Sequence, residues 1–170
     1  GVMWRGWDPR SASPSAPERA TAIVARLRTR TGATAALIAA AVALATPPLW
    51  TTFRPRWLPW FLESYINGVH IFDQPQPYLF ALFPWAAFAF AGFAAGCFLI
   101  TPWARRRNLL AVSLIAAAGA ALLALGFWLD SLPQFYAVYD FWHSSPNFFL
   151  IRIGLLTALL LVGYFWCRWA

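Results

Sequence analysis

The sequence has little charge and no lysine. Its 170 residues include thirteen arginines and six acidic residues, so that charged residues make up 11% of the chain and hydrophobic residues 61%. A soluble domain has about a quarter charged residues, and the low content here excludes water as the main solvent of the chain. Because most of the arginines lie beside long apolar stretches, we expect a membrane protein with no nucleic-acid partner.

Common motifs of catalysis and cofactor binding are also absent. The sequence has no Walker P-loop, G-x-S-x-G, C-x-x-C or G-x-G-x-x-G motif. Cys97 and Cys167 lie within or at the end of apolar stretches, where cysteine acts as a small hydrophobic residue rather than as part of a disulfide or metal site. No apolar stretch contains a histidine that could ligate a haem or a chlorophyll-type pigment. We therefore assign no catalytic residue, no metal and no cofactor.

Four apolar stretches are each long enough to cross a bilayer, whose core of about 30 Å requires about 20 helical residues. They predict transmembrane helices over residues 32–53, 78–101, 109–129 and 148–167. The connections are an outer loop with an interfacial segment over 54–77, a basic loop over 102–108 and a second outer loop over 130–147. The predicted fold class is an all-α integral membrane protein of four transmembrane helices.

The N-terminal region is polar and basic. Residues 1–14 are rich in Ser and Pro and are expected to form an arm. Residues 15–31 predict an amphipathic interfacial helix, because Ser15 and Glu18 have capping-box spacing and apolar residues recur at helical intervals. Its arginines, and those of the basic loop, suit an anionic membrane surface: Arg19, Arg26, Arg28, Arg30, Arg105, Arg106 and Arg107.

The arginines also predict the orientation. Ten lie in the N-terminal region, the basic loop and the C-terminus, whereas Arg54 and Arg56 are the two in the opposite loops. By the positive-inside rule both termini are cytoplasmic, and the expected location is a bacterial inner membrane, either cytoplasmic or intracytoplasmic.

Small residues in the second predicted helix suggest a surface for helix packing. Gly92 and Gly96 have the G-x-x-x-G spacing, with Ala91 and Ala95 beside them. Such residues allow another helix to approach closely in lipid. We expect these four residues to contact other transmembrane helices.

Arg152 is the one arginine inside a predicted span. A buried guanidinium is costly in lipid, but this one is near the outer end, where it can reach the interface or pair with Asp130 or Asp140. The functional alternative is contact with an anion or a lipid headgroup, together with Asp140 and His143. His70 and Asp73 complete a set of loop residues that could perform acid–base chemistry, although their spacing matches no ligand motif.

Several segments resemble a known family over roughly residues 60–160. They are Tyr65-Ile66-Asn67-Gly68, Leu82-Phe83-Pro84-Trp85-Ala86-Ala87-Phe88 with Ala91, Gly92 and Gly96 after it, Asp140-Phe141-Trp142-His143-Ser144-Ser145-Pro146, and Phe149-Leu150-Ile151-Arg152-Ile153-Gly154. The family is the bacterial membrane acyltransferase-like family related to heparan-α-glucosaminide N-acetyltransferase. The resemblance implies transfer of an acetyl group from cytoplasmic acetyl-coenzyme A to a sugar amine across the membrane.

The family pattern is matched only in part. Its members are longer, have more spans and use a histidine in their N-terminal half, a region without a counterpart in residues 1–60. His143 and Arg152 match the pattern without an assigned role, and no catalytic residue is carried over.

Two functions remain open. The missing catalytic half favours a non-catalytic accessory subunit, whose partners are the lipid bilayer and the other transmembrane subunits of a larger complex, for example a respiratory or photosynthetic one. The alternative is the C-terminal part of a transmembrane acyltransferase, which implies acetyl-coenzyme A as a ligand.

Overall fold

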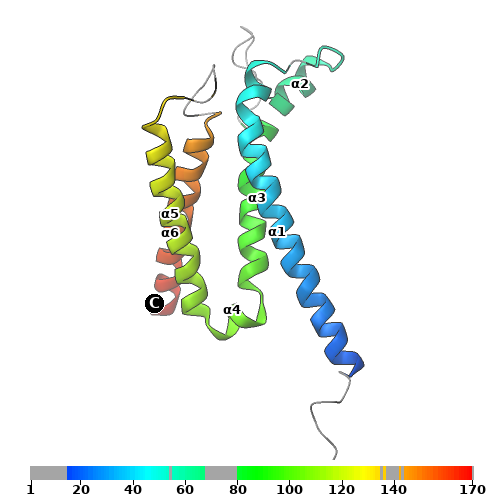
Figure 1. The fold of residues 1–170 in the computed structure, drawn as a ribbon, viewed down its shortest axis with the longest axis vertical. Coiled ribbons are helices and arrows are strands. Elements are labelled where there is room, and N and C mark those ends of the chain that lie inside the picture. The colour runs from blue at the N-terminus through cyan, green and yellow to red at the C-terminus, as the bar shows by residue number, and fades with distance from the viewer. Residues whose placement is uncertain are drawn as a thin grey trace, which may run out of the picture.

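The helices of the protein follow the apolar stretches of its sequence (Figure 1). The computed structural model describes residues 15–53, 55–67, 80–134, 136, 142 and 144–169. The helices are α1 (Ala16–Thr51), α2 (Trp60–Asn67), α3 (Leu82–Leu99), α4 (Pro102–Arg106), α5 (Asn108–Asp130) and α6 (Pro146–Trp169). Within the described part of the chain every element is helical, and α1, α3, α5 and α6 are long and apolar enough to cross a membrane. The prediction of four membrane-length helices in an all-α fold is confirmed.

Local signals set the ends of these helices. α5 coincides with the predicted span 109–129 to within one residue at each end, between Arg107 and Ser131. α6 begins after Ser145, whose Oγ accepts hydrogen bonds from the backbone amides of Asn147 and Phe148 at 3.1 and 3.2 Å. This is the N-cap arrangement that satisfies free amides at a helix start. The hydroxyl of Thr101 caps α4 by accepting from the amide of Ala104 at 3.2 Å.

α1 differs from the predicted division into an interfacial helix over 15–31 and a span over 32–53. It is one continuous helix, and residue 31 is not a helix end. The hydroxyls of Thr29 and Thr31 donate to the carbonyls of Ala25 and Leu27 at 3.0 and 2.9 Å, so these polar side chains are accommodated within the helix. Beyond its first turn, α1 contains no proline before Pro47, and the helix ends four residues after it at Thr51.

The four long helices form two pairs. α1 packs along α3, α5 packs along α6, and the contacts between the two pairs are sparse. We call the end that carries α2 the α2 end and the opposite end, which carries α4, the α4 end (Figure 1). α1 begins and α6 ends at the α4 end.

Small side chains form the seam between α1 and α3. Ala35, Ala39 and Ala43 recur every four residues along α1 and are all buried, and Ala87 is buried opposite them on α3. At the α2 end, Trp50 Nε1 donates a hydrogen bond of 3.0 Å to the carbonyl of Phe83, where the backbone of α3 is not helical. The spacing of four residues places the alanines on one face and lets the two backbones approach closely.

Glycines form the seam between α5 and α6. A Cβ added to Gly154 of α6 would lie 2.6 Å from the Cβ of Leu123 and 2.7 Å from the carbonyl oxygen of Gly119. A Cβ added to Gly126 would lie 2.8 Å from a side-chain carbon of Ile151, and one added to Gly119 would overlap the hydroxyl of Thr157. These positions have no room for a larger residue, so their glycines set the distance between the two helices.

Candidate functional site

Arg152 lies in the second turn of α6, near the α2 end, and its side chain is partly exposed. Its Nη2 donates to the carbonyl oxygen of Trp142 at 3.4 Å. Its guanidinium carbon lies 3.9 Å from the ring centroid of Phe148 and 5.4 Å from that of Trp85. A guanidinium over an aromatic face is attracted by the ring quadrupole, and the attraction grows where water is scarce. The rings therefore offset part of the cost of holding this charge within a membrane-length helix.

Further ring contacts extend from Arg152 across the two helix pairs. Trp142 packs edge-on against Phe148 at 4.9 Å between centroids, and Phe88 packs on Phe149 at 4.7 Å. We name the whole group the aromatic cluster; it consists of Phe80, Trp85, Phe88, Trp142, Phe148 and Phe149. Because Phe80, Trp85 and Phe88 lie in or just before α3 and the others in or just before α6, the cluster joins the two helix pairs at the α2 end.

The cluster brings together segments that are distant in the sequence. Trp85 belongs to the 82–88 segment of the family resemblance, Trp142 to the 140–146 segment and Arg152 to the 149–154 segment. Arg152 stands out in the sequence as a charge within an apolar stretch, whereas nothing in the sequence marks its aromatic partners as a group. Phe148 could have been found, because residues four apart on a helix are neighbours, whereas the contact with Trp85 depends on how α3 meets α6.

Other predicted site residues fall outside the cluster or outside the described structure. Asp140, His143, His70 and Asp73 lie outside the described residues, so their relation to Arg152 stays a prediction. Asp130 is exposed at the end of α5. Among the residues that the structure describes, no three His, Cys, Asp or Glu side chains gather where they could hold a metal ion.

The predicted packing glycines are open within this chain. A Cβ added to Gly92 or Gly96 would meet no atom within 4 Å, so neither glycine is at a close helix contact here. Their neighbour Ala91 instead packs against the buried cluster of Ala43, Ala87 and Phe149, while Ala95 is partly exposed. Contact of Gly92 and Gly96 with helices outside the described chain stays a prediction.

The basic residues gather toward the α4 end. Arg105, Arg106 and Arg107 are exposed around the end of α4, and Arg26 and Arg30 are exposed on the first half of α1. Arg28 Nη1 donates to the carbonyl of Ile100 at 3.2 Å, which ties α1 to the end of α3. Arg19 lies in the first turn of α1. Arg168 Nη1 donates to the hydroxyl of Tyr164 at 3.0 Å near the end of α6.

Comparison with protein-family models, with curated proteins and with solved structures finds no match for this chain. Four membrane-length apolar helices, with most of their surfaces exposed, place the chain among helical membrane proteins in a lipid bilayer.

Proposed function

We propose that this chain is a membrane-embedded part of an acyltransferase that moves an acetyl group from acetyl-coenzyme A to a sugar amine. The supporting observation is the meeting of Trp85, Trp142 and Arg152, one from each of three segments that carry the family resemblance. A functional site requires side chains from separate segments to be held in a defined mutual geometry, as these three are.

The role proposed for Arg152 is to hold the acceptor. Its guanidinium offers several fixed donors, which suit sugar hydroxyls or an anionic group on the acceptor. The ring of Trp142 is 62% exposed beside it and provides an apolar surface for a sugar ring. This arrangement binds and orients; it supplies no nucleophile or base, and those groups would come from residues other than the aromatic cluster.

The orientation belongs to the same proposal. The α4 end, with its exposed Arg105, Arg106 and Arg107, faces the cytoplasm of a bacterial inner membrane, and the α2 end with Arg152 faces outward. Acetyl-coenzyme A is then available at the α4 end and the acceptor sugar at the α2 end.

The test is acetyl transfer by membranes that contain the full polypeptide. Radiolabelled acetyl-coenzyme A is supplied with glucosamine as the acceptor, and the variants are Arg152→Gln, Arg152→Lys and, as a control, Arg168→Gln. Loss of a charged hydrogen bond costs about 1.5–3 kcal/mol, so we expect Arg152→Gln to raise the KM for the sugar by about tenfold or more. Arg152→Lys should restore part of the affinity, since it keeps the charge but not the planar donor set.

Arg168 is the control residue for Arg152, because both are arginines of α6. Arg168 bonds to Tyr164 at the far end of α6, so its replacement should leave the KM for the sugar unchanged. Absence of both acetyl transfer and acetyl-coenzyme A binding in the parent protein would contradict the proposed function. Equal effects of Arg152→Gln and Arg168→Gln would contradict the role of Arg152.

A second candidate function is supported by Gly92 and Gly96. These two glycines have the spacing of a helix-contact motif, but a Cβ added to either would meet no atom of the described residues within 4 Å. An accessory subunit that packs against a larger membrane complex would use such a face. The test is whether other proteins co-purify with the chain from the native membrane and whether Gly92→Leu and Gly96→Leu abolish their association. A positive result in both would favour this function over the acyltransferase.

A further inference from the structure

An open cleft of about 880 Å³ lies between the two helix pairs. One wall consists of small residues of α1 and α3, including Ala36, Ala40 and Ala94. The other wall consists of bulky residues of α5 and α6, including Leu122, Leu150 and Ile153. The volume is within the range of about 300–1,000 Å³ that is common for small-molecule sites.

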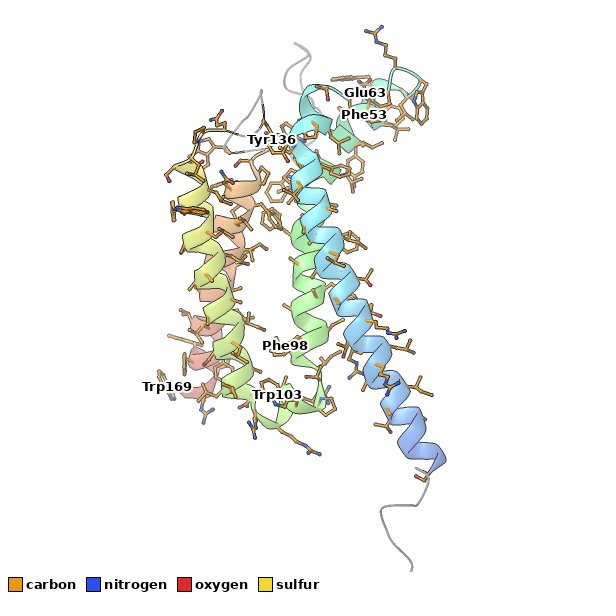
Figure 2. The ribbon with its side chains drawn as sticks, in the orientation of Figure 1. Phe53, Glu63, Phe98, Trp103, Tyr136 and Trp169 are labelled. Atoms are coloured by element: carbon orange, nitrogen blue, oxygen red, sulfur yellow. The ribbon has the colours of Figure 1, made fainter. Side chains whose placement is uncertain are left out.

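Polar side chains line one end of the cleft alone. Asp130, Gln134, Tyr136 and Asn147 are all at the α2 end, and the remaining lining toward the middle of the bundle is apolar. The Tyr136 hydroxyl donates to the carbonyl of Leu44 at 2.8 Å and so links the segment after α5 to α1 (Figure 2). The cleft is therefore amphipathic along its length, with a polar mouth and an apolar interior.

The cleft matches one leaflet of a bilayer. Eight residues separate Leu122 from Asp130 along α5, and Ala36 from Leu44 along α1, which corresponds to about 12 Å at 1.5 Å per residue. The hydrocarbon core is about 30 Å thick, so the cleft spans less than half of it. The hydrogen bond between Tyr136 and Leu44 crosses the cleft at the α2 end. The occupant that fits best is therefore a hydrocarbon chain that comes from the leaflet at the α2 end and stops near the middle of the bilayer.

The charge of the mouth selects the head of that occupant. Among the described residues that line the cleft, Asp130 carries the one carboxyl group, and none is Arg, Lys or His. A carboxylate accepts hydrogen bonds and repels anions, while Gln134 and Asn147 both donate and accept. A head with hydroxyl donors and no negative charge is favoured, and a carboxylate or phosphate at this position is disfavoured.

We propose that the cleft binds the apolar chain of a membrane amphiphile, with its uncharged hydroxyl head at the mouth near Asp130, Gln134 and Asn147. The apolar part of the cleft offers water no hydrogen-bond partners, and hydrocarbon from the bilayer is the medium that suits it. The small-residue wall gives a smooth surface along which an unbranched chain can lie. This proposal is independent of acetyl transfer.

Photolabelling of the full chain tests the proposal. The protein is placed in phosphatidylcholine nanodiscs with a monoacylglycerol that carries a diazirine in its chain, and the labelled residues are identified by mass spectrometry. A fatty acid with the same diazirine chain is the comparison probe, because it differs in having an anionic head. We expect the monoacylglycerol label on the cleft residues of α1, α3 and α6, with weaker labelling by the fatty acid.

Cleft-filling variants supply the matched control. Ala36 and Ala40 are exposed residues of the cleft wall, and Ala41 is an exposed residue of the same helix outside it. We expect Ala40→Phe and Ala36→Phe each to lower cleft labelling by about tenfold, because the phenyl ring would occupy part of the space that the bound chain requires. Ala41→Phe should leave labelling unchanged. The two cleft variants are independent, so misfolding of one leaves the other as the test.

Three outcomes would overturn the proposal. The first is labelling that is equal in Ala40→Phe and Ala41→Phe, or that is spread over all exposed helix faces. Either result would indicate ordinary contact with the bilayer. The second is fatty-acid labelling as strong as that of the monoacylglycerol. The third is capture of a helix of another polypeptide by a photoreactive residue placed at position 40, which would identify the occupant as protein.

Discussion

At the scale of single residues, the presence or absence of a Cβ decides how the helices meet. Gly119, Gly126 and Gly154 each lie where a Cβ would meet atoms of the facing helix at less than 3 Å. Gly163 lies nine residues further along α6, and a Cβ added there would meet no atom of the described residues within 4 Å. Glycine costs helix stability in water, so its use at the seam is explained by close approach rather than by local preference.

This difference predicts opposite effects for two alanine substitutions in one helix. Gly154→Ala places a methyl group 2.7 Å from the carbonyl of Gly119, so we expect a loss of about 1–3 kcal/mol in the free energy of unfolding. Gly163→Ala meets nothing and should be neutral or stabilising by up to about 1 kcal/mol. Thermal unfolding in one detergent measures both. A Gly154→Ala protein as stable as the parent would show that the seam relaxes freely.

At the scale of helices, much of the fold could be predicted, since charged or capping residues bound each apolar stretch. Arg107 and Asp130 fix α5 to within one residue of its predicted span. The junction between the basic segment and the first span was harder, because Thr29 and Thr31 bond to their own helix and leave no break. A single sequence shows composition along a helix, but not whether two neighbouring segments share one axis.

The candidate site could be predicted only in part for a related reason. Spacing identified Gly92 and Gly96, yet the tight contacts within the chain are made by Gly119, Gly126 and Gly154. Spacing places residues on a common face, but the tertiary arrangement decides which face meets another helix. Arg152 could be predicted as a site residue from its charge within an apolar stretch. Its contact with Trp85 could not, because that contact depends on how α3 and α6 are arranged in the fold.

The α1–α3 pair provides a prediction about a single hydrogen bond. Trp50→Phe removes the donor to the Phe83 carbonyl but keeps most of the ring, so we expect a loss of about 1 kcal/mol in stability. Trp57 is 81% exposed, and Trp57→Phe is the matched control, expected to stay within about 0.5 kcal/mol of the parent. Thermal unfolding of both variants compares them directly, and equal shifts would mean that the Trp50 bond contributes nothing specific.

The open glycine face provides a second prediction at this scale. The Cβ of Gly92→Leu or Gly96→Leu meets no atom of the described residues within 4 Å, so we expect the stability of the purified protein to change by no more than about 0.5 kcal/mol. Association with helices outside the chain should weaken, because leucine prevents close backbone approach. Unfolding curves and co-purification from the native membrane measure the two effects separately. An unchanged complex with both variants would exclude this face as a contact surface.

At the scale of the whole molecule, the two helix pairs differ in how they are held together. α1 and α3 meet through alanines, α5 and α6 meet through glycines, and the aromatic cluster adds ring contacts between the two pairs at the α2 end. The cleft lies beside this junction, and Phe149 belongs to both.

The placement of the ends of these helices predicts the accessibility of three positions. The background replaces Cys97 and Cys167 with serine, and single cysteines are introduced as Arg106→Cys, Arg168→Cys and Trp57→Cys. Residue 106 is the last residue of α4, and residue 168 is near the end of α6, so both lie at the α4 end of the molecule. Residue 57 lies in the segment before α2. A membrane-impermeant thiol reagent applied to intact cells should therefore label residue 57 alone.

Inverted membrane vesicles should give the reverse pattern, with residues 106 and 168 labelled and residue 57 protected. Each cysteine is also tested after detergent solubilisation, which should make all three reactive and so confirms that protection comes from the bilayer. Because α5 and α6 make two crossings between residues 106 and 168, these two residues must behave alike. If intact cells showed labelling of one of these residues without the other, the number of crossings between them would be odd. That result would contradict the membrane topology on which the proposed roles of Arg152 and the cleft depend.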